Sequence, residues 1–226
     1  MFGIIVAIPE ELKSIKEIMN DVTAEKKYNT DFYIGKIKNK ECVVSICGVG
    51  KVNAAKTTQF MIDNYCPDKI INCGVAGGLG NRVKIGDIVI GEKLVQHDFD
   101  LTAFGREKGE VSNEVGKFIY SDKSLVEKAL KISNNIVFVL GTIAPGDIFI
   151  TDSKMSSKIN TKFNADCCEM EGAAVAQTCF LDNVPFLVIR SISDSPSDNN
   201  KVDYDTFVGE ASQKVASFIE NLFNEL

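Results

Sequence analysis

The sequence predicts a single α/β domain of three layers, with helices on both faces of a central mixed, mostly parallel sheet. Short apolar runs and helical patterns are mixed along the whole chain, as a layered α/β fold requires. The length of 226 residues suits one domain with a sizeable buried core. We find no internal repeat, low-complexity segment or Pro/Ser-rich linker, so we expect residues 1–226 to form one domain.

The first half of the chain begins with a strand and a helix. Residues 2–7 form a short apolar run typical of a buried parallel strand. Pro9 then opens a helical pattern. The patterning next predicts two strands, a helix, a strand that runs into a glycine-rich turn, and two further strands. These lie at residues 33–37, 42–47, 52–65, 69–73, 74–80, 87–91 and 93–97.

The second half continues the alternation. Helical spacing predicts helices at residues 124–132 and 169–181, and branched or apolar runs predict strands at residues 135–142 and 185–191. A C-terminal helix is expected from about residue 204, because its apolar positions recur at helical spacing.

Bulk properties exclude several classes of partner. The net charge is −6 and the pI is about 5.0, which argues against nucleic acid or an anionic membrane as a partner. No apolar stretch approaches the length of a membrane span, and the N-terminus lacks the features of a signal peptide. The seven cysteines contain no C-x-x-C pair, so we expect reduced, buried thiols and a cytoplasmic protein.

Two glycine-rich segments invite a phosphate-binding interpretation. Gly48-Val-Gly50-Lys51 fails the phosphate-loop pattern, because Ser45 and Val52 stand where glycine and Ser/Thr are needed, and Asn53 breaks the dinucleotide fingerprint. The glycines of residues 74–80 fit either tight packing at a strand exit or close approach of the backbone to a flat ligand. Neither segment alone is specific evidence for a ligand-binding site.

Acidic side chains occur at three places where strands end or helices begin. Glu10 and Glu11 follow the first strand, Glu169 and Glu171 open the alanine-rich helix, and Asp194 follows the last buried strand. Each acid alone is explained by a helix dipole or a cap. Ligands bind at the carboxyl ends of parallel strands, so the three segments together predict one shared acidic crevice.

Paired carboxylates suit cleavage of a sugar–base bond. One carboxyl protonates the leaving base, another activates water, and nearby negative charge stabilises the cationic sugar. The single histidine, His97, and the absence of H-E-x-x-H and C-x-x-C motifs argue against a Ser-His-Asp triad and a zinc site. We expect no metal and no cofactor.

At these acids the sequence resembles the 5′-methylthioadenosine/S-adenosylhomocysteine nucleosidase family of the nucleoside phosphorylase/hydrolase superfamily. The resemblance covers nearly the whole chain and keeps the order of the motifs. It rests on residues 3–11 (GIIVAIPEE), 48–52 (GVGKV), 72–78 (NCGVAGG), 84–89 (KIGDIV), 100–105 (DLTAFG), 146–150 (GDIFI), 169–174 (EMEGAA) and 190–194 (RSISD).

The resemblance implies distinct roles for the acids. Glu11 would position or deprotonate the attacking water. Asp194, oriented by Ser193, would address N7 and the exocyclic amine of adenine. Glu171 would bind a ribose hydroxyl, and Arg190 would lie behind the acids.

The resemblance also implies the contacts of the base and the sugar. Phe149 would stack on the purine, the backbone of Ile150 would read its edge, and Met170 would pack on the sugar. The remaining lining of this pocket would be Val75, Ala76 and Gly77.

The 5′ end of the nucleoside would meet an apolar subsite. Ile8, Val49 and Tyr204 would face the 5′-alkylthio group, and the absence of a basic cluster disfavours a 5′-phosphate. Leu101 and Phe104 would come from a second subunit, so the resemblance implies a homodimer.

Three alternatives stay open. A phosphorolytic relative would need cations near the first strands, where this chain has Glu10 and Glu11. A futalosine hydrolase would share the fold and differ in substrate. A nucleoside-binding module without chemistry is favoured only by Val75, which replaces a serine frequent in the family and thought to help hold the water.

Overall fold

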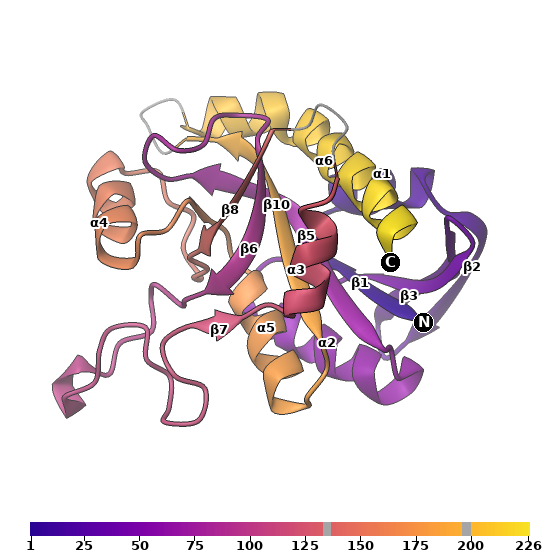
Figure 1. The fold of residues 1–226 in the computed structure, drawn as a ribbon, viewed down its shortest axis with the longest axis horizontal. Coiled ribbons are helices and arrows are strands. Elements are labelled where there is room, and N and C mark those ends of the chain that lie inside the picture. The colour runs from indigo at the N-terminus through magenta and orange to yellow at the C-terminus, as the bar shows by residue number, and fades with distance from the viewer. Residues whose placement is uncertain (133–136, 196–199) are drawn as a thin grey trace.

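The computed structural model describes residues 1–132, 137–195 and 200–226, and Figure 1 shows helices packed around one continuous sheet. The strands are β1 (Phe2–Val6), β2 (Asn20–Lys27), β3 (Thr30–Ile37), β4 (Lys40–Ile46), β5 (Lys69–Gly78), β6 (Ile88–Leu94), β7 (Ile119–Tyr120), β8 (Phe138–Ile143), β9 (Cys167–Cys168) and β10 (Phe186–Asp194). The helices are α1 (Pro9–Glu17), α2 (Lys51–Tyr65), α3 (Lys123–Ala129), α4 (Ser153–Phe163), α5 (Gly172–Leu181) and α6 (Asn200–Glu225), with a short 3₁₀ helix η1 at Thr102–Phe104.

The sheet is mixed. Parallel pairings join β1 to β4 and to β5, and β5 to β10, so the carboxyl ends of β1, β5 and β10 lie at one edge. Antiparallel pairings add β3 and β2 beyond β4. At the other end of the sheet, β10 pairs with both β5 and β6. β6 pairs with β8, β8 pairs with β9, and β9 pairs with β5. These five strands therefore form a closed ring.

Helices cover both faces, as the three-layer prediction requires. Successive strand residues point to opposite faces, and β1 shows the alternation. Ile4 packs in one core with Ile15 of α1 and Phe218 of α6. Ile5 packs in a second core with Met61 of α2 and residues of α5. Figure 1 shows α6 along the upper side of the view and α2 and α5 along the lower side. The predicted α/β class is confirmed.

The structure corrects several predicted boundaries near the carboxyl edge. Gly74 to Gly78 continue β5 as extended strand, so the expected glycine turn begins later. β10 extends through Asp194, and α5 begins at Gly172 with Glu171 at its N-cap, after the predicted start at residue 169. The acids at these positions thus lie in or directly beside regular structure, which holds their backbones in place.

Other differences lie away from that edge. The two strands predicted at residues 87–97 are one strand, β6, with an irregular register between Gly91 and Lys93. The strand predicted at residues 135–142 is observed as β8, and residues 135 and 136 lie outside the described residues. β2, α4 and the two-residue strands β7 and β9 were not predicted. β2 is almost entirely exposed and lacks an apolar face. α6 begins four residues before its predicted start, and no helix in the described ranges is long and apolar enough to span a membrane.

Candidate active site

A cavity of about 500 Å³ opens at the carboxyl ends of β1, β5 and β10. It is lined by every predicted site residue except Arg190, Leu101 and Phe104. The predicted residues that line it are Ile8, Glu11, Val49, Val75, Ala76, Gly77, Phe149, Ile150, Met170, Glu171, Ser193, Asp194 and Tyr204. The three acidic segments therefore meet in one crevice.

Glu11 enters the cavity from the first turn of α1. Pro9 at the start of this helix needs no N–H partner, so the backbone can turn sharply out of β1. One carboxylate oxygen, Oε2, accepts hydrogen bonds from the N–H groups of Ala7 (2.7 Å) and Ile8 (3.2 Å). The other, Oε1, accepts one from Val75 (2.9 Å). Val75 thus serves the carboxylate through its backbone N–H, which every residue except proline would supply at this position.

The glycine at position 74 makes room for Glu11. A Cβ built on Gly74 would lie 2.3 Å from Glu11 Oε1, closer than any real contact. The glycine-rich end of β5 is therefore needed for close approach of a carboxylate to the strand backbone. Both interpretations of these glycines, close packing and a functional approach, apply at this residue.

Opposing effects act on the ionisation of Glu11, which is buried. Burial raises the pKa of its carboxyl, because the charged form loses hydration. The Arg190 guanidinium and the three N–H donors lower it, but burial has the larger effect and the net pKa is raised. A carboxylate in this setting can take up a proton from water.

Arg190 lies behind the cavity as the central cation of the acidic cluster. It is fully buried in β10, forms a short ion pair with Glu169 and donates to the side chain of Asn72. The Asn72 amide in turn donates to the carbonyl of Ile5 in β1 (3.0 Å). Removing the arginine would leave a buried carboxylate without a counter-ion, a change that costs about 3–5 kcal/mol in proteins.

Glu171 stands at the N-cap of α5 and reaches across the cavity to the loop after β4. Its Oε1 accepts a hydrogen bond from the N–H of Gly50 (2.7 Å). Burial, and then the negative charge of Glu169, raise the pKa of Glu171 to about 8, and this shift favours the protonated carboxyl. A protonated carboxyl can both donate to and accept from a sugar hydroxyl.

Asp194 ends β10 and is aimed by an irregularity of that strand. The register of β10 against β5 shifts between Ile192 and Asp194, as at a β-bulge, which redirects the side chains that follow. The Ser193 hydroxyl donates to Asp194 Oδ1 (2.7 Å), and a Cβ on Gly77 would lie 3.1 Å from Oδ2. Burial raises the pKa of Asp194, and the hydrogen bond from Ser193 opposes this shift. The net shift favours a carboxyl that holds a proton to donate.

Aromatic and aliphatic side chains form the walls away from the acids. The rings of Phe149 and Tyr204 meet edge to face, with centroids 5.7 Å apart. Ile8 and Val49 add apolar surface beside them. Burial raises the pKa of Tyr204 to about 12, so its hydroxyl stays neutral.

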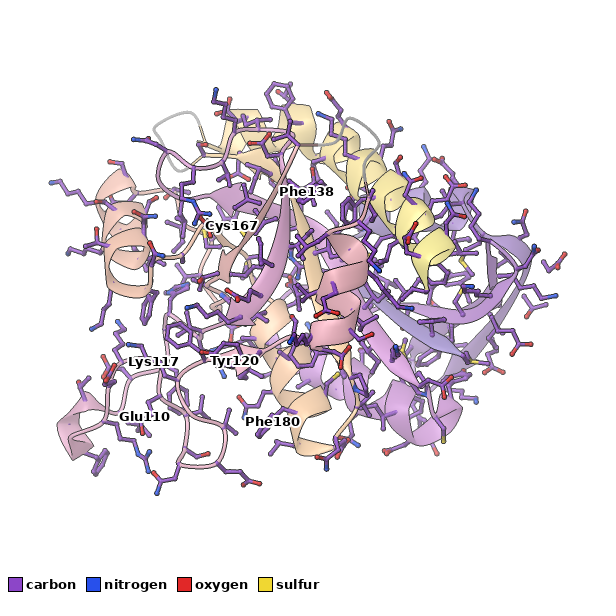
Figure 2. All side chains as sticks on the ribbon, viewed as in Figure 1. Glu110, Lys117, Tyr120, Phe138, Cys167 and Phe180 are labelled. Atoms are coloured by element: carbon purple, nitrogen blue, oxygen red, sulfur yellow. The ribbon has the colours of Figure 1, made fainter. Side chains whose placement is uncertain are left out.

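Leu101 and Phe104 lie outside the cavity of their own chain. Leu101 is the N-cap of η1 and Phe104 is its last residue, in a segment that projects from the body of the molecule at the lower left of Figure 1. Figure 2 shows Glu110 and Lys117 on the same projection. The Phe104 side chain is 82% exposed, which is high for an aromatic residue.

Five residues that line the cavity were not predicted from the sequence as site residues: Ala7, Ile148, Cys168, Glu169 and Asp205. Ala7, Ile148 and Asp205 adjoin predicted residues, so proximity in sequence was a usable signal for them. Glu169 had been singled out as an acid but not assigned to the site. Nothing in the local sequence marks Cys168. Within residues 1–132, 137–195 and 200–226, no group of three His, Cys, Asp or Glu side chains is arranged to hold a metal ion.

A family model described as the phosphorylase superfamily matches residues 1–226. The chain belongs to the phosphorylase superfamily. Within this superfamily it is 37% identical over 228 residues to the 5′-methylthioadenosine/S-adenosylhomocysteine nucleosidase of Shewanella loihica, and the match covers 99% of each chain. The resemblance drawn from the motifs is confirmed.

Solved structures of the superfamily match over the full length. A 5′-methylthioadenosine/S-adenosylhomocysteine nucleosidase from Helicobacter pylori has a TM-score of 0.95 at 35% identity, covering 100% of this chain and 98% of that one. A structure described as futalosine hydrolase, also from Helicobacter pylori, has the same TM-score and identity, covering 100% of this chain and 97% of that one. Backbone similarity alone therefore does not separate the two substrates.

Proposed function

We propose that the protein hydrolyses the N-glycosidic bond of 5′-methylthioadenosine and S-adenosylhomocysteine and releases adenine, without metal or phosphate. The observation that carries this proposal is the set of acid groups in the cavity. Glu11, Glu169, Glu171 and Asp194 line it, whereas none of its described lining residues is Lys, Arg or His. A phosphate nucleophile would find no cation to bind among these lining residues, whereas carboxyl groups can activate water and donate a proton to the leaving base.

In the proposed reaction a water oxygen forms a bond to C1′ while the bond from C1′ to N9 of adenine breaks. Glu11 accepts a proton from the water. The electron pair of the broken bond moves to the purine, and Asp194 donates a proton to N7. Glu171 holds a ribose hydroxyl, and Phe149 stacks on the base. The products are adenine and the 5-thioribose, and the two carboxyls exchange protons with solvent before the next cycle.

The 5′ subsite supports a thioether substrate. Ile8 and Val49 are apolar, and Tyr204 presents a neutral hydroxyl and a ring. The Shewanella loihica relative, which is named as a nucleosidase for these two compounds, supports the same substrates. Futalosine hydrolysis is the second candidate, because the structure described as a futalosine hydrolase fits equally well.

The test is base release in phosphate-free buffer. The protein is incubated separately with methylthioadenosine, adenosylhomocysteine and futalosine, and the free base and sugar are measured by chromatography. We expect adenine and a reducing thioribose, at a rate that added phosphate does not increase. A strict requirement for phosphate would contradict hydrolysis, faster cleavage of futalosine would favour the second candidate, and binding without base release would favour a non-enzymatic module.

We also propose a homodimer in which Leu101 and Phe104 reach the cavity of the partner subunit. The exposure of Phe104 on a projecting segment supports this arrangement. We expect the 24.7 kDa chain to sediment at about twice its mass, and we expect Phe104→Ser to raise the KM. A monomer with full activity would contradict the proposal.

A cytoplasmic location and a single domain over residues 1–226 complete the proposal. All seven cysteines are unpaired, which suits a reducing compartment. The family model matches the same span, and one sheet contains strands from β1 to β10. Cell fractionation tests the location, and a single cooperative unfolding transition tests the domain.

A further inference from the structure

Lys51, in the glycine segment that failed the phosphate-loop pattern, makes an ion pair that the proposed reaction does not use. Its Nζ donates to Asp98 Oδ1 (2.8 Å) and to Gln96 Oε1 (3.0 Å). The Lys51 and Asp98 side chains are 19% and 18% exposed, so water screens this pair less than it screens a surface pair. Gln96 is buried and donates to Gln177 of α5 (2.7 Å), which fixes this end of the network.

Asp147 closes the network into a cycle. The second oxygen of Asp98, Oδ2, accepts a hydrogen bond from the backbone N–H of Asp147 (2.9 Å). The Asp147 carboxylate accepts one from the backbone N–H of Lys51 (2.8 Å), at the first turn of α2. A Cβ on Gly50 would lie 3.2 Å from this carboxylate, so the glycine permits the close approach. Segments near residues 50, 98 and 147 are thus tied to one another.

Two walls of the cavity are attached to this cycle. On one side Gly50, next to Lys51, donates its N–H to Glu171 Oε1. On the other side Phe149 lies two residues after Asp147 and lines the cavity. Lys51, Asp98 and Asp147 do not themselves line it. They can act on the nucleoside only through the residues that they hold.

We propose that Lys51, Asp98 and Asp147 form a latch that positions Glu171 and Phe149 to bind the nucleoside. The three are positioning residues. The inference rests on the proposed function for its kinetic consequence, whereas the structural consequence at Gly50 is independent of it.

The latch predicts a specific kinetic signature. Glu171 and Phe149 hold sugar and base, whereas Glu11 and Asp194 act on the reacting atoms from α1 and β10. None of the latch bonds described above involves these two elements. Loosening the latch should raise the KM by about 10-fold and lower kcat by less than about threefold, because misplaced binding groups weaken capture of the substrate.

The matched variants are Asp98→Asn and Lys51→Met, with Lys51→Arg as the conservative rescue. In Asp98→Asn an NH₂ group replaces one acceptor and faces either Lys51 Nζ or the Asp147 N–H. Glu220→Gln is the control, because it breaks the ion pair between Glu220 of α6 and Lys38 of the β3–β4 turn, and neither residue lines the cavity. We expect Asp98→Asn and Lys51→Met to show the KM effect, Lys51→Arg to keep most of the affinity, and the control to match the unmodified protein.

Hydrogen exchange tests the latch without relying on catalysis. The Gly50 N–H is bonded to a buried carboxylate, so deuterium uptake in a peptide spanning residues 44–54 reports on the bond. We expect uptake to be about 10-fold faster in Asp98→Asn and Lys51→Met and unchanged in the control. An inactive unmodified protein would overturn the proposed function, and the exchange result would still decide the latch. Unchanged exchange, or a fall in kcat at constant KM, would overturn the latch.

Discussion

Replacing Glu11 with Gln is expected to lower kcat by about 10²- to 10⁴-fold and to change the affinity for the nucleoside by less than about threefold. The amide cannot take the proton of water. The amide also fits poorly. Both carboxylate oxygens of Glu11 accept hydrogen bonds from the backbone N–H groups of Ala7, Ile8 and Val75, and in Gln an NH₂ donor would face one of these N–H groups. Turnover is measured as adenine release, and affinity by calorimetry with a non-cleavable nucleoside analogue.

The neighbouring acid provides the control for this variant. Glu10 is exposed in the same first turn of α1 and differs from Glu11 mainly in direction. Glu10→Gln should leave kcat within about twofold, as surface substitutions usually do. If Glu11→Gln lost affinity for the nucleoside while its kcat stayed unchanged, the role of Glu11 in activating water would be contradicted.

Replacing Asp194 with Asn is expected to lower kcat for methylthioadenosine by about 10²- to 10⁴-fold, because the amide cannot donate a proton to N7. The loss should be much smaller for an aryl O-glycoside of 5-methylthioribose, because its leaving group departs as a stable anion and needs no proton from Asp194. Burial raises the pKa of Asp194, so its protonated form persists to higher pH than for an ordinary aspartate. Activity of the unmodified protein should fall as the pH rises through that pKa.

The pH profile adds a second measurement for Asp194. The alkaline fall should vanish in Asp194→Asn, because the group that loses its proton is gone. Asp63→Asn is the matched control, since Asp63 is an exposed aspartate on α2 that accepts a hydrogen bond from Gln59 of the same helix. An equal loss for both leaving groups would show that Asp194 acts in some way other than proton donation.

Much of the fold follows from patterns within short segments. Apolar runs and helical spacing located most strands and helices, because buried faces impose local periodicity. β2 was not predicted, because its residues are exposed and its strand conformation depends mainly on pairing with β3. The continuation of β5 through Gly74 was also not predicted. Pairing of β5 with β10 and the hydrogen bond from Val75 to Glu11 hold this glycine-rich segment extended.

The site was predicted less evenly than the fold. The motifs brought Glu11, Glu171 and Asp194 together, and the structure places all three in one cavity. The bulge that aims Asp194 depends on register between β10 and β5, which no local pattern records. The bond from Lys51 to Asp98 joins residues 47 positions apart, and only the folded chain makes it visible.

The closed ring formed by β5, β9, β8, β6 and β10 also affects how the molecule meets other molecules. Strands within a ring have their backbone groups paired on both sides, so the ring offers little template for strand addition by another chain. Among the described strands, β2 ends the path on the opposite side of the sheet and has a neighbour on one side only. Its charged sequence, NDVTAEKK, discourages edge-to-edge aggregation. Peptide fusions and engineered assemblies are therefore best attached along β2, away from the catalytic strands.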